Sequence, residues 1–281
     1  MLRKAAAYAN QVPRAMVRRR ARDADYAARP ALIANSFPKS GTHLLIQILQ
    51  GLPNAIYFGS FIASMPTIPF RERSCEAHLR LIGRTVPGEV VGAHIFYDPE
   101  HAAALARLNC AHFFVYRDPR DVAVAEAHYL TRMNRWHRMH RYFARHLETD
   151  GERISAAILG VSDPDFPYDY PDIARRFARY RGWLDRTDVF AMRFEDLISE
   201  NRRETPARIT SFYGSRGDVK IDADAVLDEI EANIDPRKSH TFREGRSGGW
   251  KKAFTPRHKE QMKRVAGQLL IDLGYEQDHA W

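Results

Sequence analysis

The sequence predicts an α/β fold with a central parallel sheet and helices on both faces. Apolar segments of strand length alternate along the chain with segments whose apolar residues recur at helical spacing. Hydrophobic residues make up 44% of the 281 residues, which is enough to bury a substantial core. Such alternation is typical of a parallel sheet, because the connections between parallel strands place helices on its faces.

Four apolar segments are predicted to be the core strands: "PALIANSF" (30 to 37), "GEVVGAHIF" (88 to 96), "AHFFVYR" (111 to 117) and "DVFAMRF" (188 to 194). Helices are predicted at 42–52, 99–108, 119–146, 172–185, 195–213 and 222–234, and from Pro256 onward. The segment 147–170 has no clear period and is predicted to be a long surface loop, of the kind that often shapes an acceptor site.

The first 29 residues are predicted to be a basic extension of a single domain that spans residues 30 to 281. Residues 1–22 contain seven Arg and Lys residues and no acid, so most of the formal net charge of +8 lies there. Such a tail can bind anionic lipid as an amphipathic helix, act as an Arg-rich targeting peptide, or stay solvated. Because the remaining chain is nearly neutral, we do not expect it to bind nucleic acid.

No apolar stretch is long enough to cross a bilayer or to serve as a signal peptide. This predicts a cytoplasmic location, with peripheral contact at the inner membrane surface through the basic extension. Cys75 and Cys110 have no partner at the spacing of a zinc motif, so the sequence predicts neither a disulfide framework nor a metal site.

The turn Pro-Lys-Ser-Gly-Thr, between the first strand and the first helix, predicts an anion site. The N-terminus of a helix that follows a parallel strand presents unpaired N–H groups and partial positive charge. Gly41 lets the backbone approach the anion, Ser40 and Thr42 add hydroxyl donors, and Lys39 adds a mobile charge. In a Walker A motif the lysine follows the glycine, whereas here it precedes Ser-Gly-Thr. An ordinary helix start capped by Ser or Thr is the alternative.

Three segments together resemble the sulfotransferases that use 3'-phosphoadenosine 5'-phosphosulfate (PAPS). "FPKSGTHLL" is similar to their 5'-phosphosulfate loop, and "VYRDPRDVAVAEAHYL" (115 to 130) resembles the strand-loop-helix that binds the 3'-phosphate. "FREGRSGGWKKAFT" (242 to 255) resembles their RKGxxGxWKxxF element. The motifs occur in the family's order and frame residues 31–274.

The resemblance implies a three-layer, P-loop-like fold and a metal-free transfer of a sulfuryl group from PAPS to a hydroxyl or amine. The acceptor would be a small molecule, a lipid or a glycan. His94, at the end of the second strand, aligns with the family's catalytic histidine, and Lys39 would stabilise the leaving phosphate. The resemblance assigns donor binding to Lys39, Ser40, Gly41, Thr42 and His43 at the 5' end, and to Arg117, Arg243 and Gly245 at the 3'-phosphate.

The chain departs from the family pattern at several positions. Gly92 stands where a lysine precedes the catalytic histidine, Ala125 where a serine helps to bind the 3'-phosphate, and Leu44 where a tryptophan packs on adenine. His43, Glu244 and Phe194 replace a threonine, a lysine and a tyrosine.

The segment 251–260, "KKAFTPRHKE", partly resembles the family's KxxxTVxxxE dimerisation string. Pro256 stands where that string has valine, and proline lacks a backbone donor. A homodimer through this segment is therefore a further expectation from the resemblance.

Two other functions fit parts of the sequence. A P-loop nucleotide kinase shares the strand-turn-helix arrangement, but the chain lacks the GK[ST] string and an Asp at a strand end suited to hold magnesium. A non-catalytic binder of anionic lipid or nucleic acid would act through residues 1–22 instead of the turn.

Overall fold

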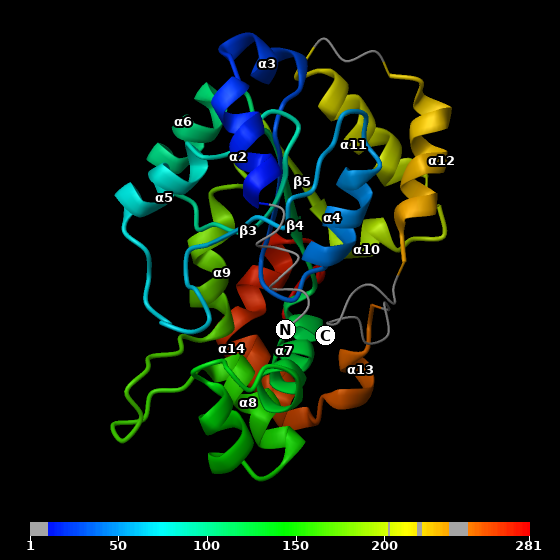
Figure 1. Cartoon of the computed structure of the whole chain (residues 1–281). Coiled ribbons are helices and arrows are strands. Elements are labelled where there is room, and N and C mark those ends of the chain that lie inside the picture. The colour runs from blue at the N-terminus through cyan, green and yellow to red at the C-terminus, as the bar shows by residue number, and fades with distance from the viewer. Residues whose placement is uncertain (1–10, 202, 218–220, 236–246) are drawn as a thin grey trace. The chain divides into compact units, whose positions relative to one another are not determined.

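The structure is a computed structural model that describes residues 11–201, 203–217, 221–235 and 247–281. Contacts within the chain group into two compact units, and many of their elements are labelled in Figure 1. Unit 1 comprises residues 1–64, 73–116 and 182–242. Unit 2 comprises residues 65–72, 117–181 and 243–281.

Unit 1 contains a five-stranded sheet with the strand order β2-β3-β1-β4-β5, in which all neighbouring strands are parallel. The strands are β1 (Leu32–Ser36), β2 (Phe61–Ala63), β3 (Val90–His94), β4 (Ala111–Tyr116) and β5 (Val189–Arg193). This confirms the predicted α/β class and the four predicted strands. The sequence did not predict β2, because three residues are too few to show a period.

The helices of unit 1 surround this sheet. They are α2 (Gln11–Arg20), α3 (Asp23–Ala28), α4 (Thr42–Gln50), α5 (Cys75–Ile82), α6 (Pro99–Arg107), α10 (Phe194–Leu197), α11 (Glu204–Gly214) and α12 (Ala223–Asn233). The sequence predicted α4, α6 and α12 closely, whereas α5 was not predicted. The predicted helix 195–213 is two helices, α10 and α11, with a break between them.

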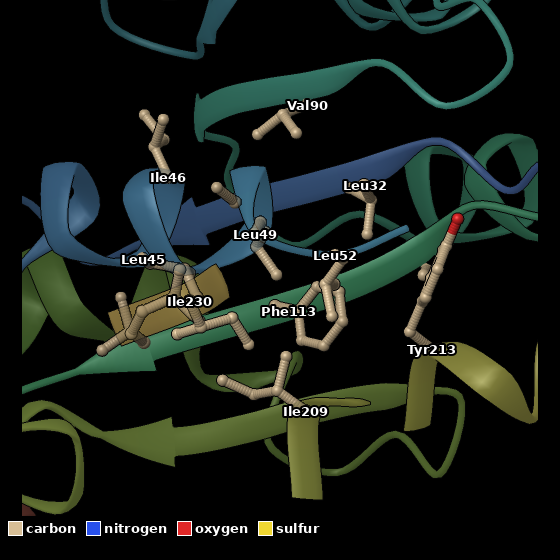
Figure 2. Packing of buried hydrophobic residues seen from close by; sticks show 14 of the residues in the cluster. Leu32, Leu45, Ile46, Leu49, Leu52, Val90, Phe113, Ile209, Tyr213 and Ile230 are labelled. Atoms are coloured by element: carbon tan, nitrogen blue, oxygen red, sulfur yellow. The ribbon is translucent and has the colours of Figure 1, made fainter. Parts of the chain in front are cut away.

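One face of the sheet packs against α4, α11 and α12 (Figure 2). Leu45 and Leu49 of α4 lie with Ile230 of α12 and Phe113 of β4 in one buried cluster. The helices approach closely, since a Cβ built on Gly51, at the end of α4, would lie 2.7 Å from the Cα of Ile230. This packing holds α4, and with it the predicted anion-binding turn, against β1 and β3.

The described part of the basic extension packs against other residues of unit 1. Arg14 of α2 donates from Nε to the buried carboxylate of Glu89 at 2.7 Å, and Tyr26 donates to the carbonyl of Thr85 at 2.8 Å. Arg14 is therefore an internal ion-pair partner. Membrane contact by this extension stays a prediction.

Unit 2 is helical. It contains α7 (Pro119–His128), the π-helical turns η1 (Tyr129–Met133) and η2 (Tyr142–His146), α8 (Asp150–Leu159), α9 (Ile173–Arg181), α13 (Trp250–Ala253) and α14 (Pro256–Asp272). The prediction of one continuous helix over 119–146 is wrong. The chain is no longer helical directly after Met133, and a separate helical turn, η2, follows. Among all the described helices, none is both long and apolar enough to cross a membrane.

The prediction that 147–170 is a loop is wrong for its first half, which forms α8. Thr149 and Glu152 form a reciprocal capping box at the N-terminus of this helix. Ile154, Ala157 and Ile158 then bury one face at helical spacing. Both signals are present in the sequence, but the Pro and Asp residues further along the segment obscured them.

Opposite the cluster of Figure 2, the sheet buries an uncharged histidine. His112 of β4 is 2% exposed, its ring packs edge-on at 4.4 Å from Trp183, and neither ring nitrogen has a hydrogen-bond partner among the described residues. Because burial penalises the charged imidazolium, the pKa of His112 is lowered to about 3.

We expect this histidine to make the protein acid-sensitive. The unfolded chain binds a proton at His112 below about pH 6.5 but the folded chain only near pH 3, so stability is lost as the pH falls through this window. The free energy of unfolding in urea should decrease by up to about 1.4 kcal/mol per pH unit there. His112→Phe should reduce this dependence of the free energy of unfolding on pH. Near pH 8 the histidine is neutral in both states, so the variant and the wild type should show the same pH dependence. An unchanged acid slope in the variant would contradict the assignment.

Candidate functional site

The predicted anion-binding turn lies between β1 and α4, at the carboxyl edge of the sheet. Lys39 and Gly41 both adopt left-handed backbone conformations, with φ of 67° and 97°. Leu45 N–H donates to the Gly41 carbonyl, which starts the helix, while Ser40 and Thr42 are buried. Ser40 Oγ has no hydrogen-bond partner among the described residues. A buried hydroxyl left in this state at a helix N-terminus is available to donate to a bound anion.

Ser36, the last residue of β1, links this turn to His94. Its Oγ lies 2.6 Å from Thr42 Oγ1 and 3.1 Å from His94 Nδ1, and its carbonyl oxygen lies 3.0 Å from the same nitrogen. A carbonyl oxygen only accepts, so Nδ1 carries the proton and the lone pair of the neutral ring lies on Nε2. The contact therefore puts His94 in the tautomer that can accept a proton at Nε2.

Asn35 fixes the segment that follows His94. Its side-chain Oδ1 accepts from Ile95 N–H at 2.9 Å and from Ser36 N–H at 3.0 Å, and its Nδ2 donates to the Ile95 carbonyl at 3.2 Å. The sequence reasoning missed both Asn35 and Ser36. The available signal was a pair of polar residues at the end of a strand whose preceding residues are all apolar.

Three departures from the family pattern lie in packed surroundings. At Gly92 of β3 a Cβ would lie 2.6 Å from the ring of Phe61 and 2.9 Å from Ile46, so a side chain there would require these neighbours to move. Leu44, which replaces the expected tryptophan, packs against the buried cluster of Figure 2. Phe194 lies directly against the turn, because a Cβ on Gly41 would be 2.5 Å from its Cδ2.

In unit 2, Asp121 joins the second and third sequence motifs. Its carboxylate accepts from Gly248 N–H at 2.7 Å and from Trp250 N–H at 2.9 Å, and it lies 3.4 Å from a guanidinium nitrogen of Arg117. Arg117 is thereby held at the start of α7, beside the described end of the Gly-rich loop.

Arg120 has other partners. It forms an ion pair with Asp118 at 2.8 Å and a second one with Glu276, and its guanidinium lies 4.0 Å from the centre of the Trp250 ring. Arg120 and Trp250 therefore pack against each other at the described end of the loop.

Two predicted site residues, Arg243 and Gly245, lie outside the described residues. Glu126 of α7 is 9% exposed and forms an ion pair with Arg176. Its carboxylate is therefore already neutralised by a structural partner. His43 lies half-buried in the first turn of α4.

The sequence of residues 29–274 matches the model of the sulfotransferase domain. The chain belongs to the sulfotransferase family. This confirms the family that the three motifs indicated. No curated protein sequence is significantly similar to this sulfotransferase.

Solved structures support the fold. The chain is similar to mouse sulfotransferase SULT7A1 complexed with PAP, with a TM-score of 0.60, 16% identity, and coverage of 89% of this chain and 86% of that one. It is also similar to retinol dehydratase in complex with androsterone and inactive cofactor PAP, with a TM-score of 0.56, 15% identity, and coverage of 89% and 83%. At these identities the likeness confirms the P-loop-like α/β fold.

The packing of Phe194 on the turn predicts that Gly41→Ala destabilises this sulfotransferase more than Gly248→Ala does. Both glycines have positive φ, of 97° and 81°, so a Cβ costs about 1–2 kcal/mol at either position. Only at Gly41 does it also collide with a ring, since no described atom lies within 4 Å of a Cβ on Gly248. We expect the Tm of Gly41→Ala to be lower than that of Gly248→Ala by roughly 2–4 °C or more. Equal Tm values would contradict the close contact.

Proposed function

We propose that this sulfotransferase moves a sulfuryl group from PAPS to a hydroxyl or amine of a small-molecule, lipid or glycan acceptor. The observation that carries the proposal is the hydrogen-bonded link through Ser36, which connects an anion-binding turn to a histidine with its lone pair on Nε2. A nucleotide kinase needs no such base and would need a magnesium-binding carboxylate near the turn.

The residues of the turn suit a phosphate or phosphosulfate group. The N-terminus of α4 directs N–H groups and partial positive charge outward, and the buried Ser40 hydroxyl lacks a partner among the described residues. When bound, the donor supplies the sulfuryl group and a phosphate leaving group, the chemistry of an in-line displacement. We propose that Lys39, Ser40, Gly41, Thr42 and His43 bind its 5' end, and that Arg117, Arg243 and Gly245 bind its 3'-phosphate.

Each proposed catalytic residue has a separate task. Lys39 places a positive charge where negative charge grows on the leaving phosphate. Stabilising such charge is usually the largest single contribution to catalysis. His94 accepts the acceptor's proton at Nε2, and Ser36 positions the ring through Nδ1. Asp121 orients Arg117 by holding it against the end of the Gly-rich loop.

The donor can be tested without knowing the acceptor. Isothermal titration calorimetry of the full chain with PAP, in the presence of a chelator, should show one binding site. Incubation with PAPS and a panel of phenols, alcohols, amines and glycolipids should give a sulfated product, whereas ATP with magnesium should give no phosphorylated product. No heat of PAP binding at about 1 mM, where even weak specific binding is detectable, would contradict the proposed donor.

The catalytic roles predict different defects in two variants. Lys39→Ala should lower kcat by about 10²–10³-fold, because it removes charge stabilisation of the leaving group. His94→Gln should lower kcat by about 10²–10⁴-fold yet leave PAP affinity nearly unchanged, because a base is needed only for the chemical step. The exposed His146 offers a matched control, and His146→Gln should keep wild-type activity. Near-normal turnover in either catalytic variant, with the fold verified by circular dichroism, would refute that residue's role.

A further inference from the structure

Three metal-ligating side chains meet in unit 1, outside the site described above. Cys75 is the first residue of α5, Asp98 is the N-cap of α6, and His101 lies in the first turn of α6. One donor atom from each residue lies within 4.8 Å of the donor atoms of the other two. The contact between the starts of two helices brings these residues together, although Cys75 is far from the other two in the sequence.

The state of His101 points to a bound cation. Its ring is 4% exposed, and Nδ1 lies 3.3 Å from the carbonyl oxygen of Phe96. That oxygen can only accept, so Nδ1 carries the proton and Nε2 carries the lone pair. Nε2 is buried without a hydrogen-bond partner among the described residues. A histidine that donates from one ring nitrogen to a backbone carbonyl, and keeps a lone pair on the other, is the usual arrangement of a metal ligand.

The neighbouring groups supply the complementary negative charge. Asp98 uses Oδ1 to cap α6, accepting from Glu100 N–H at 2.7 Å, and its carboxylate has a second oxygen for a ligand. The Cys75 thiol lies 3.5 Å from the carboxylate of Glu100.

We propose that Cys75 Sγ, Asp98 and His101 Nε2 bind one divalent cation of the zinc class. A thiolate and an imidazole favour zinc over magnesium or calcium, which prefer oxygen ligands. On binding, the Cys75 thiol releases its proton to solvent, and Glu100 or water completes a four-coordinate site. Ligand atoms around zinc lie about 3.5 Å apart, so small side-chain rotations close the present separation.

The site would be structural. It connects the start of α5 to the start of α6, and α6 begins shortly after His94 ends β3. The expectation of no metal site rested on sequence spacing alone, which did not place Cys75 beside His101. The proposal does not depend on the sulfotransferase reaction, because none of its three ligands is proposed to bind donor or acceptor.

Cobalt and zinc titrations test the proposal on the untagged, fully reduced chain after removal of metal with a chelator. We expect one Co²⁺ per chain, with a thiolate-to-cobalt charge-transfer band in the near ultraviolet and intense visible bands of a four-coordinate ion. Zn²⁺ should displace the Co²⁺ and raise the Tm. Cys75→Ala should abolish the charge-transfer band and weaken metal binding by more than about 100-fold. A residue that only hydrogen-bonds to a metal ligand costs at most about 100-fold in affinity when it is replaced.

Cys110 offers the matched control, since it is the other cysteine of the chain and is buried in unit 1. Cys110→Ala should keep the band, the affinity and the Zn²⁺-dependent rise in Tm. If His101→Gln fails to fold, Asp98→Asn, which keeps the helix cap, should still weaken binding. The proposal is overturned if Co²⁺ shows no thiolate band, or if Cys75→Ala and Cys110→Ala bind alike. PAP binding measured on the same samples reports separately on the proposed donor site.

Discussion

The parallel pairing of β1 with both β3 and β4 is the constraint on which the proposed catalytic site depends. Parallel strands bring their carboxyl ends to one edge, and the register pairs Asn35 with Ala93 and Ser36 with Val115. The proposed anion-binding turn and His94 therefore follow neighbouring strands at the same edge. Buried hydrogen bonds from Asn35 and Ser36 then fix the backbone and the histidine ring at this edge.

Buried polar groups do much of the positioning in both units. Ser36 and Asn35 are fully buried, and Asp121 is 3% exposed. Each satisfies several backbone or side-chain partners, so replacing one would leave buried donors or acceptors without partners. Ser40 Oγ and His101 Nε2 are also buried, but without partners among the described residues, and each lies in a site for which we propose a ligand.

The departure from the family pattern at Gly92 is coupled to the packing around His94. A side chain at Gly92 would meet Phe61 and Ile46, and Phe61 also packs edge-on at 5.0 Å from His94. The absence of a side chain at Gly92 thus leaves room for the ring of Phe61 beside His94. A lysine restored at position 92 would have to displace that ring, and so would disturb His94 as well.

The sequence by itself determined the fold class, the four long strands and the family, because apolar periodicity and three ordered motifs are local signals. It also placed Lys39 in the turn after the first strand, and His94 and Arg117 at strand ends. It could not reveal that Ser36 links the turn to His94, that Asp121 ties Arg117 to the Gly-rich loop, or that Cys75 meets His101. These contacts join residues distant in the chain, and only tertiary packing decides which polar groups are buried together and which are left to bind a ligand.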